Sequence, residues 1–207
     1  DYGIDKRAKN HWRRISMDYK KKIKSQCEKG AFSATLKPAE RKRLLVDISD
    51  SSPLSISSIG YLTKIFSNDG IKATIPNPLL LSAINEHVAH RGCMSAELVQ
   101  QIKKLFPAVK ATTEKITRPL ADFLFDLNEQ VANSEENHPS WGAFFARTVS
   151  RHLLEDSDSP NEIDDEEANW LIERILSDGQ YDYVEQKLLP LLGRRAKKNA
   201  RKFAFSN

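Results

Sequence analysis

The sequence has few cysteines and no long apolar runs. Only two cysteines, Cys27 and Cys93, occur in 207 residues, too few for a disulfide framework and typical of a reducing compartment. No apolar run approaches the roughly eighteen residues that a membrane helix requires, and no signal peptide is recognisable. We therefore expect a cytoplasmic chain without a membrane span. Because the chain begins with Asp1 rather than Met, we expect a fragment or a trimmed chain, and an upstream targeting segment stays open.

Strand-like alternation is also missing, whereas apolar residues recur at helical spacings of three or four along the whole chain. The chain is long enough to bury a proper core. We predict an all-α fold, a helical bundle of about ten helices. The clearest helices are expected at residues 5–29, 36–47, 56–66, 77–90, 95–106, 113–132, 141–154, 165–176 and 182–192.

Motifs of enzymes are absent as well. The sequence contains no nucleophile motif, phosphate-binding loop or His-Glu-x-x-His pattern, so we predict that the protein is not an enzyme. His87, His90 and Cys93 are spaced by three, as zinc ligands sometimes are. However, Gly92 is expected to end the helix before Cys93, and no fourth ligand lies nearby in sequence. The two histidines are better interpreted as partly exposed residues at a helix end.

Charge is strongly segregated although the net charge is only +4. Residues 1–30 carry ten Lys or Arg against four Asp or Glu, and residues 194–207 carry six against none. Residues 155–185 hold twelve acids and a single base, Arg174. The basic ends are therefore expected to meet an acidic partner, or this acidic block itself.

The most informative stretch is residues 156–167, which resembles the twelve-residue calcium loop of EF-hands. The predicted metal ligands are Asp156, Asp158, Asp164 and Glu167 at positions 1, 3, 9 and 12, with the carbonyl of Glu162 at position 7. Ile163 supplies the apolar residue at position 8. Two positions depart from the pattern: Pro160 replaces a ligand, and Asn161 replaces the glycine, although Asn tolerates a left-handed backbone. The alternative is an acidic connection between helices, in which Asp164 or Asp165 caps the second helix.

A second acidic turn matches the same loop less well. Asp178, Gly179, Asp182 and Glu185 fall on positions 5, 6, 9 and 12, but positions 1 and 3 would lie inside a helix. The favoured interpretation is a helix end at Gly179, followed by a capping box of Asp182 and Glu185.

The chain also matches itself at a constant offset of 109 residues. Leu44, Leu45 and Asp47 fall on Leu153, Leu154 and Asp156, and Asp69-Gly70 falls on Asp178-Gly179. We therefore predict an internal duplication. The expected organisation is a basic N-terminal helix at 1–30, a duplicated helical domain at 31–193 and a basic tail at 194–207. Within the domain, repeat 1 covers about 32–81, connecting helices 82–138, and repeat 2 about 141–192. Serines occupy positions 3, 9 and 12 of the first loop, so only the second is predicted to bind calcium.

The order Trp170-Leu171, Asp178-Gly179, Asp182 and Glu185 resembles the TerB-like family of tellurite-resistance-associated helical proteins. The resemblance covers roughly residues 141–192 and, more weakly, 32–81. It implies an all-helical, internally repeated, non-enzymatic protein linked to divalent ions and to stress or defence systems. The predicted function is thus a TerB-like helical interaction module with one weak calcium site (Ca2+) in the second repeat. Its expected partner is another protein or another part of a longer parent chain.

The alternative function is a nucleic-acid-associated adaptor, because Lys and Arg bind phosphates without a base-reading motif. This adaptor would dock through the basic ends. Its predicted nucleic-acid-binding residues are Arg13, Arg14, Lys20, Lys21, Lys22, Arg194, Arg195, Lys197, Lys198, Arg201 and Lys202.

Overall fold

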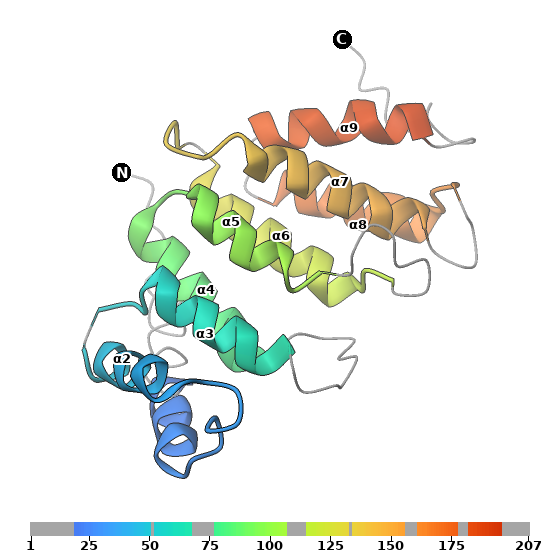
Figure 1. The fold of residues 1–207 in the computed structure, drawn as a ribbon. Helices are drawn as coiled ribbons and strands as arrows, with labels where there is room; N and C mark the ends of the chain where they lie inside the picture. The colour runs from blue at the N-terminus through green and yellow to red at the C-terminus, as the bar shows by residue number, and fades with distance from the viewer. Residues whose placement is uncertain are drawn as a thin grey trace. The chain divides into compact units, whose positions relative to one another are not determined.

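The structure is a computed structural model that describes residues 19–50, 52–67, 77–106, 115–132, 134–155, 161–177 and 182–195. Within these ranges the chain is all-α, with nine helices and no strand, as predicted. Residues 19–28 are helical, and eight labelled helices follow (Figure 1). They are α2 (Pro38–Ser49), α3 (Ile56–Ser67), α4 (Pro78–Arg91), α5 (Ala96–Lys103), α6 (Arg118–Val131), α7 (Ser140–Leu154), α8 (Asp165–Leu176) and α9 (Tyr183–Arg195). None of the helices in these ranges has the length and hydropathy needed to cross a membrane.

The chain divides into two compact units, Asp1–Gly92 and Cys93–Asn207. The division falls inside the segment 82–138 that was predicted to connect the repeats. It also separates charge: the first unit holds 17 Lys or Arg against 9 Asp or Glu, and the second holds 15 against 19. The two units therefore carry net charges of opposite sign.

Most helix ends follow the capping residues that the sequence displays. The Asn77 side chain accepts a hydrogen bond from Leu79 N (2.9 Å) at the start of α4, and Gly92 ends that helix with a left-handed φ of 68°. Ser95 Oγ accepts from Leu98 N (3.2 Å) at the start of α5. These three features confirm the predicted boundaries.

Three predicted boundaries were wrong, and proline explains two of them. The last helix, expected to end at residue 192, continues as α9 to Arg195. The helix expected from about residue 113 begins only at Arg118, because Pro119 fits the first turn of a helix but not its interior. The helix expected to reach residue 106 ends as α5 at Lys103, because the residue before Pro107 is biased away from helical backbone.

The first unit is built around α3, which packs against α2 and α4. The helix 19–28 buries Tyr19, Ile23 and Cys27 on one face, as its spacing predicted. The Tyr19 hydroxyl donates a hydrogen bond to the Glu86 carboxylate on α4. Burial, reinforced by this bond, raises the pKa of the Tyr19 phenol.

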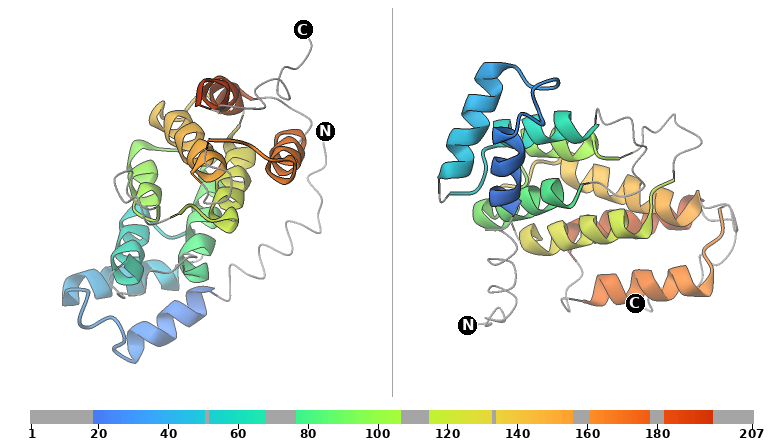
Figure 2. Two further views of the ribbon diagram at one scale, coloured as in Figure 1. Left: turned by 90° about the vertical axis from the view of Figure 1, so that its right-hand side faces the viewer. Right: turned by 90° about the horizontal axis from the view of Figure 1, so that it is seen from below.

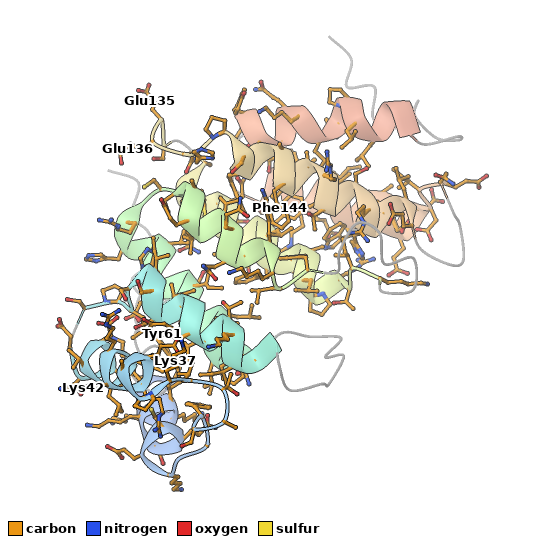
Figure 3. All side chains as sticks on the ribbon, viewed as in Figure 1. Lys37, Lys42, Tyr61, Glu135, Glu136 and Phe144 are labelled. Carbon is orange, nitrogen blue, oxygen red and sulfur yellow. The ribbon has the colours of Figure 1, made fainter. Side chains whose placement is uncertain are left out.

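The second unit is built around α7, which packs against α5, α6 and α9 (Figures 1 and 2). Trp141 and Phe145 on α7 are fully buried. The Phe145 ring meets Phe125 of α6 edge-on, with centroids 5.0 Å apart, and Phe125 meets Trp170 of α8 at 5.6 Å. Figure 3 shows Phe144 between α5 and α7. There its ring meets the Phe106 ring edge-on, with centroids 5.3 Å apart. Aromatic edges therefore join three helices of this unit.

Candidate functional site

The predicted calcium loop, residues 156–167, is called loop 2 below. Asp156 and Asp158 lie outside the described residues, whereas Glu162, Asp164 and Glu167 lie within them. Asn161 has a left-handed backbone with φ of 62°, and its N–H donates to the carbonyl of Leu154 at the end of α7 (2.9 Å). Ile163 is fully buried. Asn161 thus has the sharp turn expected at position 6 of a calcium loop. Ile163 has the burial expected at position 8.

Asp164 and Glu167 form a capping box at the start of α8. Glu167 N donates to Asp164 Oδ1 (2.8 Å), and Asp164 N donates to Glu167 Oε2 (3.1 Å). These bonds satisfy two backbone N–H groups that the first turn of a helix otherwise leaves without partners. Glu167 is only 6% exposed. The capping role expected of Asp164 in the alternative interpretation is therefore present, and one oxygen of each carboxylate faces the backbone.

A cavity of about 320 Å³ borders loop 2 and is lined by charges of both signs. Its acidic side includes Glu155, Asp164 and Glu167, and its basic side includes Arg118 and Arg151. Arg151 Nε pairs with Glu155 Oε2 at 2.9 Å. In the ranges that the structure describes, no three His, Cys, Asp or Glu side chains are grouped closely enough to hold a metal ion. A calcium site here therefore depends on the remaining ligands of loop 2.

The corresponding segment of the first unit, residues 47–58, is called loop 1. There the Asp47 carboxylate accepts hydrogen bonds from the hydroxyls of Ser55 and Ser58, the latter at 2.6 Å. Ser55 Oγ also accepts from Ser58 N (3.2 Å) and so caps α3. Positions 1, 9 and 12 of loop 1 thus converge on a single carboxylate oxygen, Asp47 Oδ2.

Helices α3 and α8 share the predicted offset at both ends, although the structure does not show the predicted duplication as a whole. α3 covers 56–67 and α8 covers 165–176, so both ends differ by the same offset of 109 residues. Leu54 and Ile163, which precede the two helices at that offset, are both fully buried. The local geometry therefore follows the register of the predicted repeat at these positions.

The second acidic turn is a capping box, as the favoured interpretation predicted. Asp182 Oδ1 accepts from Val184 N (2.7 Å) and Glu185 N (2.8 Å), and Asp182 N donates to Glu185 Oε2 (3.1 Å). Asp182 is 9% exposed and Glu185 5%. Asp178 and Gly179 lie outside the described residues.

The three residues weighed as zinc ligands lie in different surroundings, and the expected partial exposure was wrong for His87. His87 is buried, and its Nδ1 contacts the carbonyl of Leu54 in loop 1 at 2.8 Å. Because a carbonyl only accepts, Nδ1 donates this bond, and burial lowers the pKa of His87. His90 is exposed, and Cys93 follows the left-handed Gly92 as the first residue of the second unit. His87 therefore connects α4 to loop 1.

The basic residues predicted to bind nucleic acid are only partly described. Lys21 and Lys22 are exposed, whereas Lys20 Nζ donates to the carbonyls of Asp50 (3.3 Å) and Ser52 in loop 1. Arg194 and Arg195 end α9, and their side chains lie outside the described set. Arg13, Arg14, Lys197, Lys198, Arg201 and Lys202 also lie outside it.

A polar cluster between α6 and α8 was not predicted. Arg174 binds Asp122 (2.8 Å) and Asp126 (3.1 Å), and Trp170 Nε1 donates to Asp122 Oδ1 (2.9 Å). Burial raises the pKa of Asp126 even though Arg174 opposes the shift. A signal for this cluster was present in the sequence. Asp122 and Asp126 lie four residues apart in the stretch 120–127, whose other residues are all apolar, and Arg174 is the only base in residues 155–185.

Comparisons of the chain with protein-family models, with curated proteins and with solved structures found no match. The TerB-like resemblance therefore depends on the sequence residues that suggested it.

Proposed function

We propose that this chain is a non-enzymatic helical interaction module of TerB-like type, with one weak calcium site in loop 2. The proposed partner is another protein or another part of a longer parent chain. The observation that supports the calcium site best comes from loop 1, where Ser55 and Ser58 both donate to Asp47 Oδ2. If loop 2 folds in the same way, as the shared offset of α3 and α8 favours, Asp164 and Glu167 replace those serines and face Asp156.

This replacement changes the chemistry of the loop. A serine hydroxyl donates a hydrogen bond to a carboxylate, but an ionised carboxylate only accepts. Three carboxylates at positions 1, 9 and 12 therefore repel one another, and a cation between them relieves this repulsion. Calcium suits such a site, because it takes carboxylate and carbonyl oxygens in flexible arrangements. The left-handed Asn161 and the buried Ile163 favour the same interpretation.

The site is expected to be weak, because Pro160 removes the ligand at position 5. A dissociation constant of roughly 10⁻⁴ to 10⁻³ M is typical of the loosest calcium modules. With about 10 mM calcium and a constant near 1 mM, ligand linkage stabilises the folded state by about 1.4 kcal/mol. The ion would join the end of α7 to the start of α8 and so stabilise the second unit.

A thermal melt tests the proposal. For a unit of this size, calcium should raise Tm by roughly 3–6 °C relative to a chelator, and magnesium should raise it less because magnesium demands stricter geometry. Glu167→Gln should abolish the calcium shift while keeping the capping bond, since Gln also completes a capping box.

Glu166→Gln is the matched control, because Glu166 is 85% exposed, adjacent and outside the predicted ligand set. It should keep the full calcium shift. An equal calcium shift in wild type and Glu167→Gln would refute the site. The absence of any shift in wild type would do the same.

The second candidate function, nucleic-acid docking, is favoured by the basic first unit and by the exposed side chains of Lys21 and Lys22. Binding to a random-sequence duplex should weaken steeply with salt. Reversing the charges of Arg194, Arg195, Lys197 and Lys198 should flatten that dependence. Lys20→Ala should instead lower stability, because Lys20 is engaged with loop 1. A salt slope unchanged by the four reversals would exclude the basic tail as the docking site.

A further inference from the structure

The second unit contains an apolar pocket that is separate from loop 2. Its volume is about 440 Å³, within the range typical of ligand sites. The wall is formed by Pro139 and Trp141 at the start of α7 and by Tyr183 and Val184 at the start of α9, and Glu135 lies on the rim. Tyr183 is 65% exposed, an unusual state for a large aromatic side chain. An exposed ring at the mouth of an apolar pocket is typical of a docking site.

The loop that borders the pocket is firmly held. Asn137 Oδ1 accepts from Met94 N (2.8 Å), and Asn137 Nδ2 donates to the carbonyl of Val131 (2.6 Å). His138 N donates to the carbonyl of Met94 (2.8 Å). Because Met94 is fully buried, these bonds fix the loop to the core of the unit. The pocket is therefore preformed, and an occupant does not have to order it.

We propose that the basic tail of the same chain occupies this pocket, with residues 201–205 placing a phenylalanine against Tyr183 and Pro139. The tail contains Phe203 and Phe205 within a segment that has six Lys or Arg and no acid. Burial of a phenylalanine provides most of the attraction, because aromatic side chains bury about 150–250 Å² each. The tail is thus an apolar anchor surrounded by positive charge.

Charge complementarity favours the tail as the occupant. Glu135 and Glu136 are exposed and project from the loop before α7 (Figure 3). Outside the tail, the second unit carries nine Lys or Arg against nineteen Asp or Glu. One cation stands nearby, because Lys187 Nζ lies 4.2 Å from the centroid of the Tyr183 ring. Glu135 on the rim and the adjacent Glu136 on the same loop attract the basic residues that flank the phenylalanines.

The chain is long enough for this docking. From Tyr183 to Arg195, α9 advances by about 18 Å at 1.5 Å per residue. Phe203 is eight residues beyond Arg195, and an extended chain of that length spans about 26 Å. Phe203 and Phe205 can therefore return along α9 to the pocket. Because the tail is covalently attached, its effective concentration at the pocket is on the order of millimolar, so a weak contact suffices.

Competition with a free peptide tests the proposal. A synthetic peptide of residues 194–207 is titrated by calorimetry into the full chain, as wild type and as Phe203→Ala/Phe205→Ala. For a peptide dissociation constant near 0.1 mM, the attached tail should weaken peptide binding to wild type about ten-fold relative to the double variant. Equal affinities for the two chains would overturn the proposal, as would the absence of binding to both.

Controls separate the pocket from general charge attraction. Tyr183→Ala, introduced into the double variant, should weaken peptide binding. Leu176→Ala should not, although Leu176 is also a large exposed apolar residue of this unit (59%). A peptide with both phenylalanines replaced by alanine should bind at least ten-fold more weakly, and equal binding would reduce the effect to electrostatics. A wild-type dimer in sedimentation, dissolved by the double variant, would place the tail in a second copy and overturn docking within one chain.

Discussion

Asp182 is the residue whose replacement tests the packing of the second unit most directly. Its Oδ1 caps α9 through Val184 N and Glu185 N, and its Oδ2 accepts from Asn128 Nδ2 (2.6 Å). Asn128 Oδ1 in turn accepts from Trp141 Nε1 (3.1 Å). The chain of donors runs in one direction, from Trp141 through Asn128 to Asp182. Only a carboxylate offers both acceptors at its end.

Three substitutions separate the cap from the network. Asp182→Ala removes a helix cap, which costs about 1 kcal/mol, and leaves the buried amide of Asn128 without an acceptor, which costs about 1–3 kcal/mol. The expected loss is therefore about 2–4 kcal/mol. Asp182→Asn keeps the cap but turns an N–H group toward Asn128, so it should lose about 1–3 kcal/mol. Asp164→Ala, at the exposed cap of α8, should lose only about 1 kcal/mol.

The assay is urea unfolding followed by circular dichroism and tryptophan fluorescence, in the presence of a chelator so that loop 2 binds no metal. Agreement between the two signals checks that unfolding is two-state. The reasoning is refuted if Asp182→Asn is as stable as wild type, or if Asp182→Ala and Asp164→Ala lose the same free energy. Either outcome would mean that the buried network adds nothing to the cap.

Substitutions at three further positions, His87, Arg174 and Gly142, have expected outcomes. Because burial lowers the pKa of His87, the contribution of its neutral ring to the free energy of unfolding should be fully present above pH 6.5 and should be lost as pH falls through the lowered pKa. The urea midpoint of His87→Gln should therefore decrease less on acidification than that of wild type. His90→Gln should behave as wild type. Arg174→Ala should lower the free energy of unfolding by about 1–3 kcal/mol, because the partly buried carboxylates of Asp122 and Asp126 lose their hydrogen-bond donor. In the same assay, Arg174→Lys should recover only part of this loss. Gly142→Ala should raise the free energy of unfolding by about 0.5–1 kcal/mol, and Tm with it, because alanine is less flexible than glycine in the unfolded chain. The added Cβ would lie 3.4–3.7 Å from side-chain atoms of Lys187 and Val184, which are ordinary contact distances. A lower Tm would mean that α7 and α9 cannot accommodate a methyl group.

Much of the fold was predictable because local chemistry sets the helix ends. Asn77 and Ser95 supply side-chain oxygens to the first N–H groups of their helices, and Gly92 adopts a backbone that few other residues tolerate. These effects depend on neighbours within four residues, so the sequence displays them directly. The start of α6 was predicted too early because the apolar spacing continues before Arg118, whereas Pro119 fits only the first turn of a helix.

The contacts between helices were not predictable from spacing alone. Arg174 finds Asp122 from 52 residues away, and Lys20 finds the carbonyls of loop 1 from 30 residues away. Such pairs are formed when apolar faces pack, and many other pairings satisfy the same periodicity. The pocket at Tyr183 also depends on this packing, because its walls come from two helices and from a loop fixed by Met94.

The contrast between the two loops depends on which groups can donate hydrogen bonds. In loop 1, Asp47 receives hydroxyl donors from Ser55 and Ser58, so its charge is satisfied without an ion. In loop 2, the capping bond of α8 is kept, but the residues at the serine positions are Asp164 and Glu167, which cannot donate when ionised. If the two loops share one backbone, hydroxyl donors satisfy the carboxylate of loop 1, and a calcium ion is expected to play that part in loop 2. The free energy of unfolding of the first unit would then be independent of calcium, whereas that of the second unit would rise with the calcium concentration.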